Sequence, residues 1–299
     1  MRALGPNILM IGPPGAGKTM LSKRLPTILP PLTLAESLET TRIYSAAGKL
    51  ASGQALLARR PVRSPHHSAS GPALVGGGTI PQAGEVSLAH RGLLFLDEFP
   101  EFPRAILETL RQPLEEGVVT IARAHSSIEF PARFMLVAAM NPCPCGYFTD
   151  PNKPCKCSPH QIDKYLSRIS GPLIDRIDIH IEVPPVPYRE LRGRRDGSDS
   201  ATIGEQVLDA RRTQRRRFGD HSTMLNGQMG SRQLRKFCKI DEAGEQLLKQ
   251  ALTELGLSAR AHDKILRIAR TIADLAGNDN IQPDHVSEAI MYRRLDRRL

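Results

Sequence analysis

The sequence has no tryptophan, and aromatic residues make up only 4% of its 299 residues. A surface that binds nucleic acid mainly by stacking bases on aromatic rings is therefore not expected. No apolar stretch approaches the roughly 20 residues that a membrane-spanning helix needs, and the N-terminus lacks a signal-peptide pattern. These absences predict a cytoplasmic protein with no membrane partner.

Cysteine is also scarce, with five residues, but four of them are clustered as Cys143, Cys145, Cys155 and Cys157. In a reducing compartment, such clustering favours a metal site over disulfide bonds. Four thiolates can enclose a tetrahedral Zn²⁺ and leave no open position, which predicts a structural zinc site. Ordinary loop thiols and redox-active thiols are the alternatives. The fifth cysteine, Cys238, is expected to be buried on a helix.

Acidic residues are fewer than basic ones, because 41 Lys and Arg stand against 31 Asp and Glu and give a net charge of +10. This excess suits a polyanionic partner, either nucleic acid or an acidic membrane surface. A soluble protein can also be basic without such a partner. Much of the charge lies in the runs Arg211–Arg217 and Arg293–Arg298, which are expected to form solvated helix faces.

The order of apolar and polar segments predicts an α/β core followed by helices. Apolar runs predict buried strands at Asn7–Ile11, Leu93–Leu96, Phe134–Met140 and Ile177–Val183. In the last of these, alternating residues are expected to place one polar face outward. The Gly-, Pro- and Ser-rich region Gly48–Gly84 predicts exposed loops or an inserted hairpin rather than core.

Helical periodicity and turn signals fill the rest of the chain. They predict helices at Arg104–Leu114 and Ala259–Leu275, a last helix opened by Pro283, and a hairpin formed by Val118–Ala122 and Ile128–Pro131. We therefore predict a core over residues 1–191, which includes a Cys-rich loop at 143–157. A polar linker over 192–200 and a helical lid domain over 201–299 follow.

A glycine-rich turn lies between the first predicted strand and the first helix. It matches G-x-x-x-x-G-K-[ST] with Gly12, Pro13, Pro14, Gly15, Ala16, Gly17, Lys18 and Thr19. The backbone N–H groups of such a loop, at a helix N-terminus, bind phosphate oxygens. Lys18 can reach the β- and γ-phosphates, and the Thr19 hydroxyl can ligate Mg²⁺. The motif predicts a P-loop nucleotide site with a parallel-sheet core.

Polar residues also follow two further buried strands. Asp97 ends the run Leu93–Leu96, where a carboxylate can enter the magnesium shell, and Glu98 can polarise an attacking water as a general base. Asn141 follows the next apolar strand, where a neutral amide can hold the water or the γ-phosphate. Together with the P-loop, these residues predict ATP hydrolysis rather than nucleotide binding alone.

Two arginines are candidates for completing the site. Arg176 precedes a strand at which a subunit interface can present it to a neighbour's phosphate, and Arg260 opens a lid helix from which it can reach its own subunit's γ-phosphate. In so basic a chain, surface arginines are common, so spacing alone favours ordinary surface positions for both. The pair His66–His67 is interpreted as an exposed loop feature, with a metal pair or a nucleic-acid contact as alternatives.

The chain as a whole resembles the Mg-chelatase-like AAA+ ATPase family, and within it the competence protein ComM (YifB) group. The resemblance runs from about Pro6 to Arg294. The segments that carry it are Gly12–Thr19, Arg63–His67, Leu74–Gly78, Leu94–Glu98, Asn141–Gly146 and Gly256–Arg260.

The resemblance implies a Walker A motif at Gly12–Thr19, Walker B at Asp97 and Glu98, and sensor 1 at Asn141. It further implies an arginine finger at Arg176 and a sensor 2 arginine at Arg260. It also implies hexameric rings, DNA branch migration, and elements of the insert and of the hairpin that face the ring pore. Members of the group carry an N-terminal Lon-protease-like domain and an adenine-holding segment, neither of which is expected in this sequence.

The leading hypothesis is therefore an ATP- and Mg²⁺-dependent AAA+ motor that acts on branched or single-stranded DNA as a homo-hexamer. One alternative is a chelatase-type motor that drives metal insertion into a porphyrin. The other is a nucleotide-binding module that does not turn over.

Overall fold

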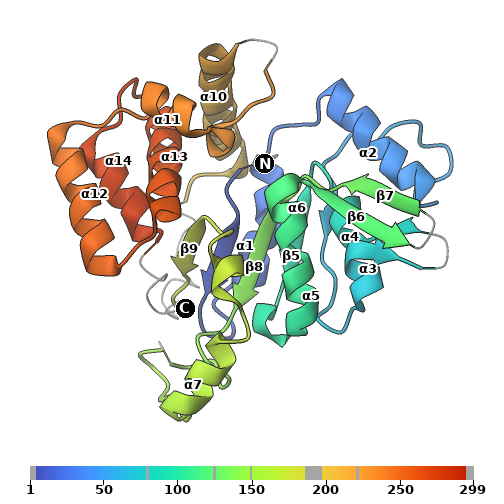
Figure 1. Cartoon of the computed structure of the whole chain (residues 1–299), viewed down its shortest axis with the longest axis horizontal. Coiled ribbons are helices and arrows are strands. Elements are labelled where there is room, and N and C mark those ends of the chain that lie inside the picture. The colour runs from blue at the N-terminus through green and yellow to red at the C-terminus, as the bar shows by residue number, and fades with distance from the viewer. Residues whose placement is uncertain are drawn as a thin grey trace.

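A central sheet with a helical unit packed beside it makes up the molecule (Figure 1). The computed structural model describes residues 5–78, 81–123, 126–148, 150–185, 197–219 and 222–293. The helical unit, drawn from yellow-brown to red, follows the sheet in sequence. The predicted fold class, an α/β P-loop core with a C-terminal helical region, is thus confirmed.

The described part of the core contains a five-stranded, wholly parallel sheet in the order β2-β5-β8-β1-β9. Its strands are β1 (Ile8–Ile11), β2 (Val62–Arg63), β5 (Leu93–Leu96), β8 (Met135–Met140) and β9 (Ile179–Glu182). Every residue of β5 and β8 is buried, as expected for parallel strands with both faces covered. Because the strands are parallel, the segments that follow β1, β5 and β8 meet at one edge of the sheet.

Short helices surround this sheet. They are α1 (Lys18–Ile28), α2 (Leu34–Ala46), α3 (Gly71–Val75), α4 (Glu85–Leu88), η1 (Phe99–Glu101), α5 (Arg104–Thr109), α6 (Arg111–Glu116), α7 (Pro159–Leu166) and α8 (Gly171–Ile174). Local signals fix several of their starts. Thr33 with Glu36, and Ser158 with Gln161, form capping boxes in which each side chain satisfies the other residue's backbone N–H.

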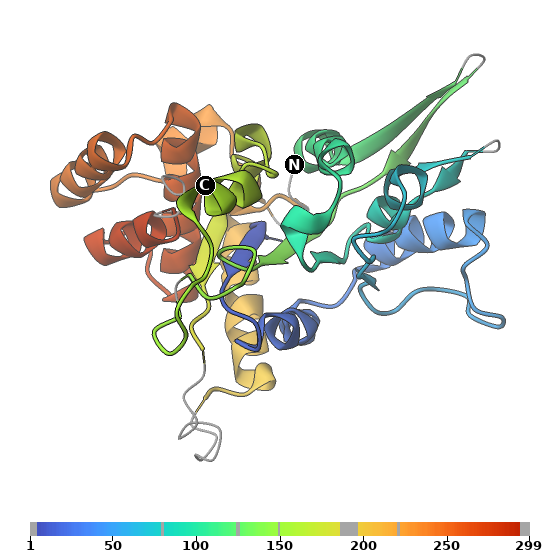
Figure 2. The ribbon, with the colours of Figure 1, turned by 90° about the horizontal axis from the view of Figure 1, so that it is seen from below.

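Two hairpins project from the same end of the core (Figure 2). One is β3 (Gly76–Gly77) with β4 (Gln82–Ala83), and the other is β6 (Val118–Arg123) with β7 (Ser126–Pro131). The two hairpins contact each other through β3 and β6. The predicted hairpin near residues 118–131 is confirmed, and the Gly48–Gly84 region does contain a hairpin, as one of its two interpretations proposed.

Two predictions about the core are wrong in part. The Gly48–Gly84 region is not all outside the core, because Val62–Arg63 pairs with Leu93–Leu94 as the edge strand of the main sheet. The single helix predicted over Arg104–Leu114 is instead divided into α5 and α6. Pro113 has no amide hydrogen, and its ring cannot pack against the carbonyl four residues earlier, so the helix is interrupted near Leu110.

The polar face predicted for the strand at 177–183 is wrong in part, because only Glu182 of its polar residues is exposed. Asp178 is 1% exposed and His180 is 3% exposed. Asp178 accepts a hydrogen bond from the backbone N–H of Asn7, and Lys264 from the helical unit lies 3.7 Å from its other oxygen. Arg293, expected on a solvated face, is fully buried and donates to the carbonyl of Ile177. The alternation is as predicted, but the helical unit covers the part of that face formed by Asp178 and His180.

The helical unit has its own apolar core. Its elements are α10 (Ser200–Phe218), η2 (Asn226–Gln228), α11 (Ser231–Phe237), α12 (Glu242–Leu255), α13 (Ala259–Leu275) and α14 (Pro283–Met291). The helices predicted at Ala259–Leu275 and from Pro283 are confirmed, and Cys238 is buried as predicted. Residues 192–196 of the predicted linker and 294–299 of the predicted lid lie outside the described residues. A bilayer-crossing segment is not found among the described helices, since each is too short or too polar.

Candidate functional site

The loop between β1 and α1 has the backbone that phosphate binding requires. Gly17, the residue before α1, has φ of 90°, a left-handed conformation that glycine adopts without strain. This conformation lets the loop turn directly into the N-terminus of α1, where free N–H groups and the helix dipole favour an anion. The predicted P-loop residues Gly12–Thr19 thus lie at the carboxyl end of β1.

Lys18 is the first residue of α1, at the end of this loop, and is 8% exposed. Its Nζ donates to the carbonyls of Gly12 at 2.6 Å and Pro13 at 2.9 Å, and to Oδ1 of Asn141 at 3.1 Å. Burial lowers the pKa of Lys18 below its usual value, while the nearby Asp97 carboxylate opposes that shift. The structure therefore brings the predicted phosphate-binding lysine and the amide of Asn141 together.

Two candidate magnesium ligands also lie side by side. The Thr19 hydroxyl donates to Oδ2 of Asp97 at 2.7 Å. The other oxygen of Asp97 accepts from the backbone N–H of Glu98 at 3.0 Å. A hydroxyl and a carboxylate are both hard oxygen ligands of the kind that Mg²⁺ selects, so this pair suits the ion.

Glu98 follows Asp97 at the same edge of the sheet and is well exposed. Its carboxylate contacts a residue from another segment, because Oε2 lies 2.9 Å from Nδ1 of His67. Nothing in the sequence connects the two residues, and the interpretation of His66–His67 as an exposed loop feature missed this contact. No sequence signal marks the contact, because it depends on the pairing of β2, which precedes His67, with β5, which precedes Asp97.

The two candidate arginines are placed differently. Arg176 is buried, and its guanidinium pairs with Glu115 on α6 and donates to the carbonyl of Pro172. Arg260 lies in the first turn of α13 and is exposed, and no hydrogen bond or ion pair joins it to another described residue. Neither guanidinium contacts the described P-loop residues, so their predicted roles rest on the resemblance.

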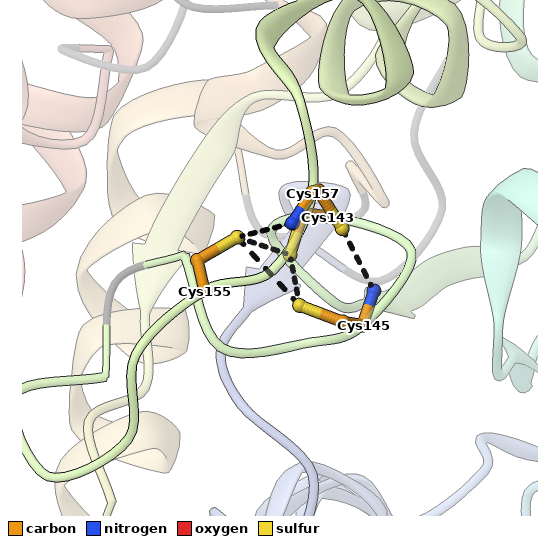
Figure 3. A group of neighbouring side chains, drawn as sticks. All are labelled: Cys143, Cys145, Cys155 and Cys157. Carbon is orange, nitrogen blue, oxygen red and sulfur yellow. Dashed lines mark hydrogen bonds between the residues drawn. The ribbon is translucent and has the colours of Figure 1, made fainter.

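The four clustered cysteines converge from both ends of one loop (Figure 3). Their sulfurs all lie within 4.8 Å of one another, and Cys143 is buried. The Sγ of Cys143 lies 3.4 Å from that of Cys145 and 3.7 Å from that of Cys155. A regular zinc tetrahedron with Zn–S bonds of about 2.3 Å places its sulfurs roughly 3.8 Å apart. The arrangement therefore fits a four-thiolate metal site.

Backbone groups favour the thiolate form at one of these positions. Hydrogen bonds from the backbone of Lys156 and Tyr147 lower the pKa of the Cys145 thiol to about 6. The thiolate is the form that binds metal. At Cys155 and Cys157 a backbone hydrogen bond acts in the same direction, but desolvation and the neighbouring thiols outweigh it and raise the pKa of both. Support for a metal therefore comes from the geometry of the four sulfurs.

The cysteine loop touches the P-loop, a contact that the sequence did not predict. Gly146 has φ of 87°, and a Cβ added there would lie 2.6 Å from Cδ of Pro14. The same loop begins two residues after Asn141, whose amide accepts from Lys18. The candidate metal site is thus attached to two parts of the candidate nucleotide site.

Two family models match the chain, one over the sheet region and one over the helical unit. A family model described as magnesium chelatase, subunit ChlI, matches residues 2–191, and a model of the ChlI C-terminal region matches residues 197–293. The chain is 48% identical to competence protein ComM of Haemophilus influenzae over 98% of its length. It is 45% identical to the uncharacterized protein YifB of Salmonella typhimurium over 99%.

A more distant relative is the chloroplastic magnesium-chelatase subunit ChlI-1 of Arabidopsis thaliana, which is 22% identical over 70% of this chain and 43% of its own. The chain spans 56% of the length of ComM and 57% of the length of YifB. The family models together cover nearly all of the sequence. On these matches the chain belongs to the Mg-chelatase-like AAA+ family, with ComM and YifB among its relatives.

Proposed function

We propose that this chain is the motor module of an ATPase that remodels DNA by a helicase-like, branch-migrating activity in a homo-hexameric ring. Family membership suggests an ATPase and implies ATP and Mg²⁺ as its ligands. The observation that carries the ATPase part is the convergence of Lys18 with Asn141 and of Thr19 with Asp97 at one edge of the sheet.

Each residue has a defined chemical role in this proposal. The loop amides and Lys18 would bind the β- and γ-phosphates. Thr19 and Asp97 would hold Mg²⁺, which would supply positive charge to neutralise the phosphates. Glu98 accepts the proton of the attacking water, and Asn141 orients that water.

The arginine roles require more than one subunit. Arg176 reaches the phosphate of a neighbouring subunit, and Arg260 reaches the phosphate of its own. Both serve to stabilise charge in the transition state, for which the planar guanidinium is suited.

Charge and shape support DNA as the polymer. The chain carries a net charge of +10, and Arg212, Arg215 and Arg216 are exposed on α10. The two projecting hairpins offer elements that can enter a ring pore (Figure 2). The chain is 48% identical to a protein named for competence and only 22% identical to a chelatase subunit. This difference also favours DNA over a porphyrin as the substrate.

For the four cysteines we propose a structural Zn²⁺. Cys143, Cys145, Cys155 and Cys157 would supply all four ligands, so no position is left for substrate or water. The zinc would close the loop that lies against the P-loop.

A chelatase-type motor is the second candidate, favoured by the description of the family models that match this chain. Such a motor would hydrolyse ATP in response to partner subunits that load a metal into a porphyrin. It would not respond to DNA. A module that binds ATP without turnover is the third candidate.

The test is ATP hydrolysis by the purified chain, with and without branched DNA, over a range of salt concentrations. We expect DNA to stimulate turnover, and the stimulation to fall steeply with salt because bound DNA releases counterions. Lys18→Ala should abolish nucleotide binding, whereas Glu98→Gln should bind ATP and not hydrolyse it.

Each alternative has its own result. A rate of ATP hydrolysis that DNA does not change at low salt would favour the chelatase-type motor. ATP binding without hydrolysis in an assembled oligomer would favour the module that does not turn over. Comparable turnover in Glu98→Gln and the parent chain would show that another group is the base.

A further inference from the structure

The contact between His67 and Glu98 joins two segments that leave neighbouring strands. We propose that His67 is a positioning residue for Glu98, whose Nδ1–H holds one carboxylate oxygen so that the other faces the attacking water. The two ring and carboxylate atoms lie 2.9 Å apart. The inference rests on the proposed function, since Glu98 is the proposed base.

Glu98 needs such a partner because its own surroundings leave it free to move. Its side chain is 56% exposed, and among the described residues no other side chain bonds to its carboxylate. Its backbone has φ of 51° and ψ of 45°, a left-handed conformation that is uncommon for a residue other than glycine. A general base acts efficiently when its oxygen is held within a narrow range of positions.

His67 is held firmly enough to serve. Its ring packs edge-on against Phe102, with ring centres 6.4 Å apart and planes at 82°. Phe102 is 2% exposed. Glu98 directly precedes η1, and Phe102 directly follows it. The imidazole therefore contacts both ends of the segment 98–102, and its position follows that segment.

The topology explains why these segments meet. His67 lies four residues beyond β2, and Glu98 lies two residues beyond β5. The two strands are parallel neighbours, so both segments leave the sheet at the same edge. His67 also precedes α3 and the β3–β4 hairpin, so the insert contributes a residue to the catalytic edge.

His66 provides a matched control. It is adjacent in sequence and its ring lies 4.0 Å from that of His67, but its Nδ1 contacts the hydroxyl of Ser68 at 2.8 Å. It therefore bonds within its own loop and not to the base.

Substitution of His67 by Asn or by Gln distinguishes the effect of a correctly placed hydrogen-bond donor from the effect of side-chain size. The amide nitrogen of Asn occupies the position of Nδ1 in histidine, whereas the amide nitrogen of Gln corresponds to Nε2. If Nδ1 holds Glu98, then His67→Asn should retain the contact and His67→Gln should not.

The test is steady-state ATP hydrolysis and nucleotide affinity of the full chain, with folding checked by thermal melting. His67→Ala should lower kcat about 10- to 100-fold, as expected when a base is misplaced, while nucleotide affinity and KM stay unchanged. His67→Asn should restore most of kcat, and His67→Gln should not. His66→Ala should stay within about 2-fold of the parent, because neutral surface changes have small effects.

A double variant shows through which group His67 acts. His67→Ala should lower the rate of the parent but not the residual rate of Glu98→Gln, because residues that act as one unit are not additive. If Glu98→Gln is inactive while His67→Ala has a normal or raised kcat, the role of His67 is overturned and Glu98 remains the proposed base. If Glu98→Gln turns over normally, the proposed base fails and the role of His67 fails with it.

Discussion

Single side chains in this molecule are tuned by burial as much as by their neighbours, and His90 is the clearest case outside the nucleotide site. It is 2% exposed, its Nδ1 accepts from the backbone N–H of Arg133, and its Nε2 faces Glu39. Burial lowers the pKa of His90 from 6.5 to about 4, and the Glu39 carboxylate opposes the shift only partly. The imidazole is therefore neutral in the folded chain near pH 7.

This depressed pKa predicts acid sensitivity. Between pH 6.5 and about 4, the unfolded chain binds a proton at His90 that the folded chain does not, so stability falls as the pH falls through this window. The shift corresponds to about 3 kcal/mol of unfolding free energy. His90→Asn keeps an acceptor for Arg133 and cannot titrate, so its urea-unfolding free energy should decline less between pH 7 and pH 4. An equal decline in both proteins would contradict this prediction.

The residues of the candidate nucleotide site fall into two groups, those whose placement a short stretch of sequence predicts and those for which it does not. Lys18, Thr19, Asp97 and Asn141 were predictable, because each is part of a short motif whose position at a strand end follows from the same stretch of sequence. The partner of Glu98 was not predictable, because His67 lies 31 residues earlier in the chain (98 − 67) and no sequence pattern links the two residues. Pairing across strands depends on sheet order, which short motifs do not encode.

Among the structural elements, the cysteine loop makes the least expected contact. The four thiols bring the two ends of the loop together, and Gly146 of the loop packs against Pro14 of the P-loop. We expect the purified chain to contain about one zinc ion per chain, as four thiolate ligands require. Cys155→Ser should lose the metal and weaken nucleotide binding, because the loop would no longer hold Gly146 and Pro14 together. Metal analysis and nucleotide titration test both parts.

Glycine substitutions separate this contact from general backbone strain. Gly146→Ala combines a left-handed backbone with a collision against Pro14, so it should weaken nucleotide binding about 10-fold, from a strain of roughly 1–3 kcal/mol. Gly48→Ala has a similar left-handed backbone, with φ of 64°, and nothing within 4 Å. It should lower stability and leave nucleotide affinity unchanged. Equal affinity in the two variants, or zinc-free protein with normal affinity, would show that the loop does not support the site.

Element boundaries show the same limit of local signals. Long, strongly periodic helices such as Ala259–Leu275 were predicted to the residue, because one face carries a complete apolar stripe. The break at Pro113 was missed although its chemistry is local. The burial of Asp178 and His180 could not be predicted, because it depends on where the helical unit packs against the sheet.

At the scale of the whole molecule, the role proposed for Arg176 would connect the fold to assembly. Its guanidinium is 9% exposed and pairs with Glu115, whose side chain is 50% exposed. To act on a neighbour's phosphate it must exchange this carboxylate for phosphate oxygens, both of which the planar guanidinium can pair with in the same way. We predict that Arg176→Ala lowers kcat about 10³-fold, in the range for an arginine finger, while nucleotide affinity stays unchanged.

Mixing variants tests whether the arginine acts between subunits. A Lys18→Ala subunit cannot bind nucleotide but still carries Arg176, and an Arg176→Ala subunit binds nucleotide but lacks the finger. Equal mixtures should therefore hydrolyse ATP although each variant alone does not, and the recovered rate should depend on protein concentration because assembly is required. If Arg176 only stabilises its own chain through Glu115, Arg176→Ala should lower the melting temperature and no mixture should recover activity. Arg176→Lys keeps a charge for Glu115 without the planar fork, so it should restore the melting temperature but not the rate.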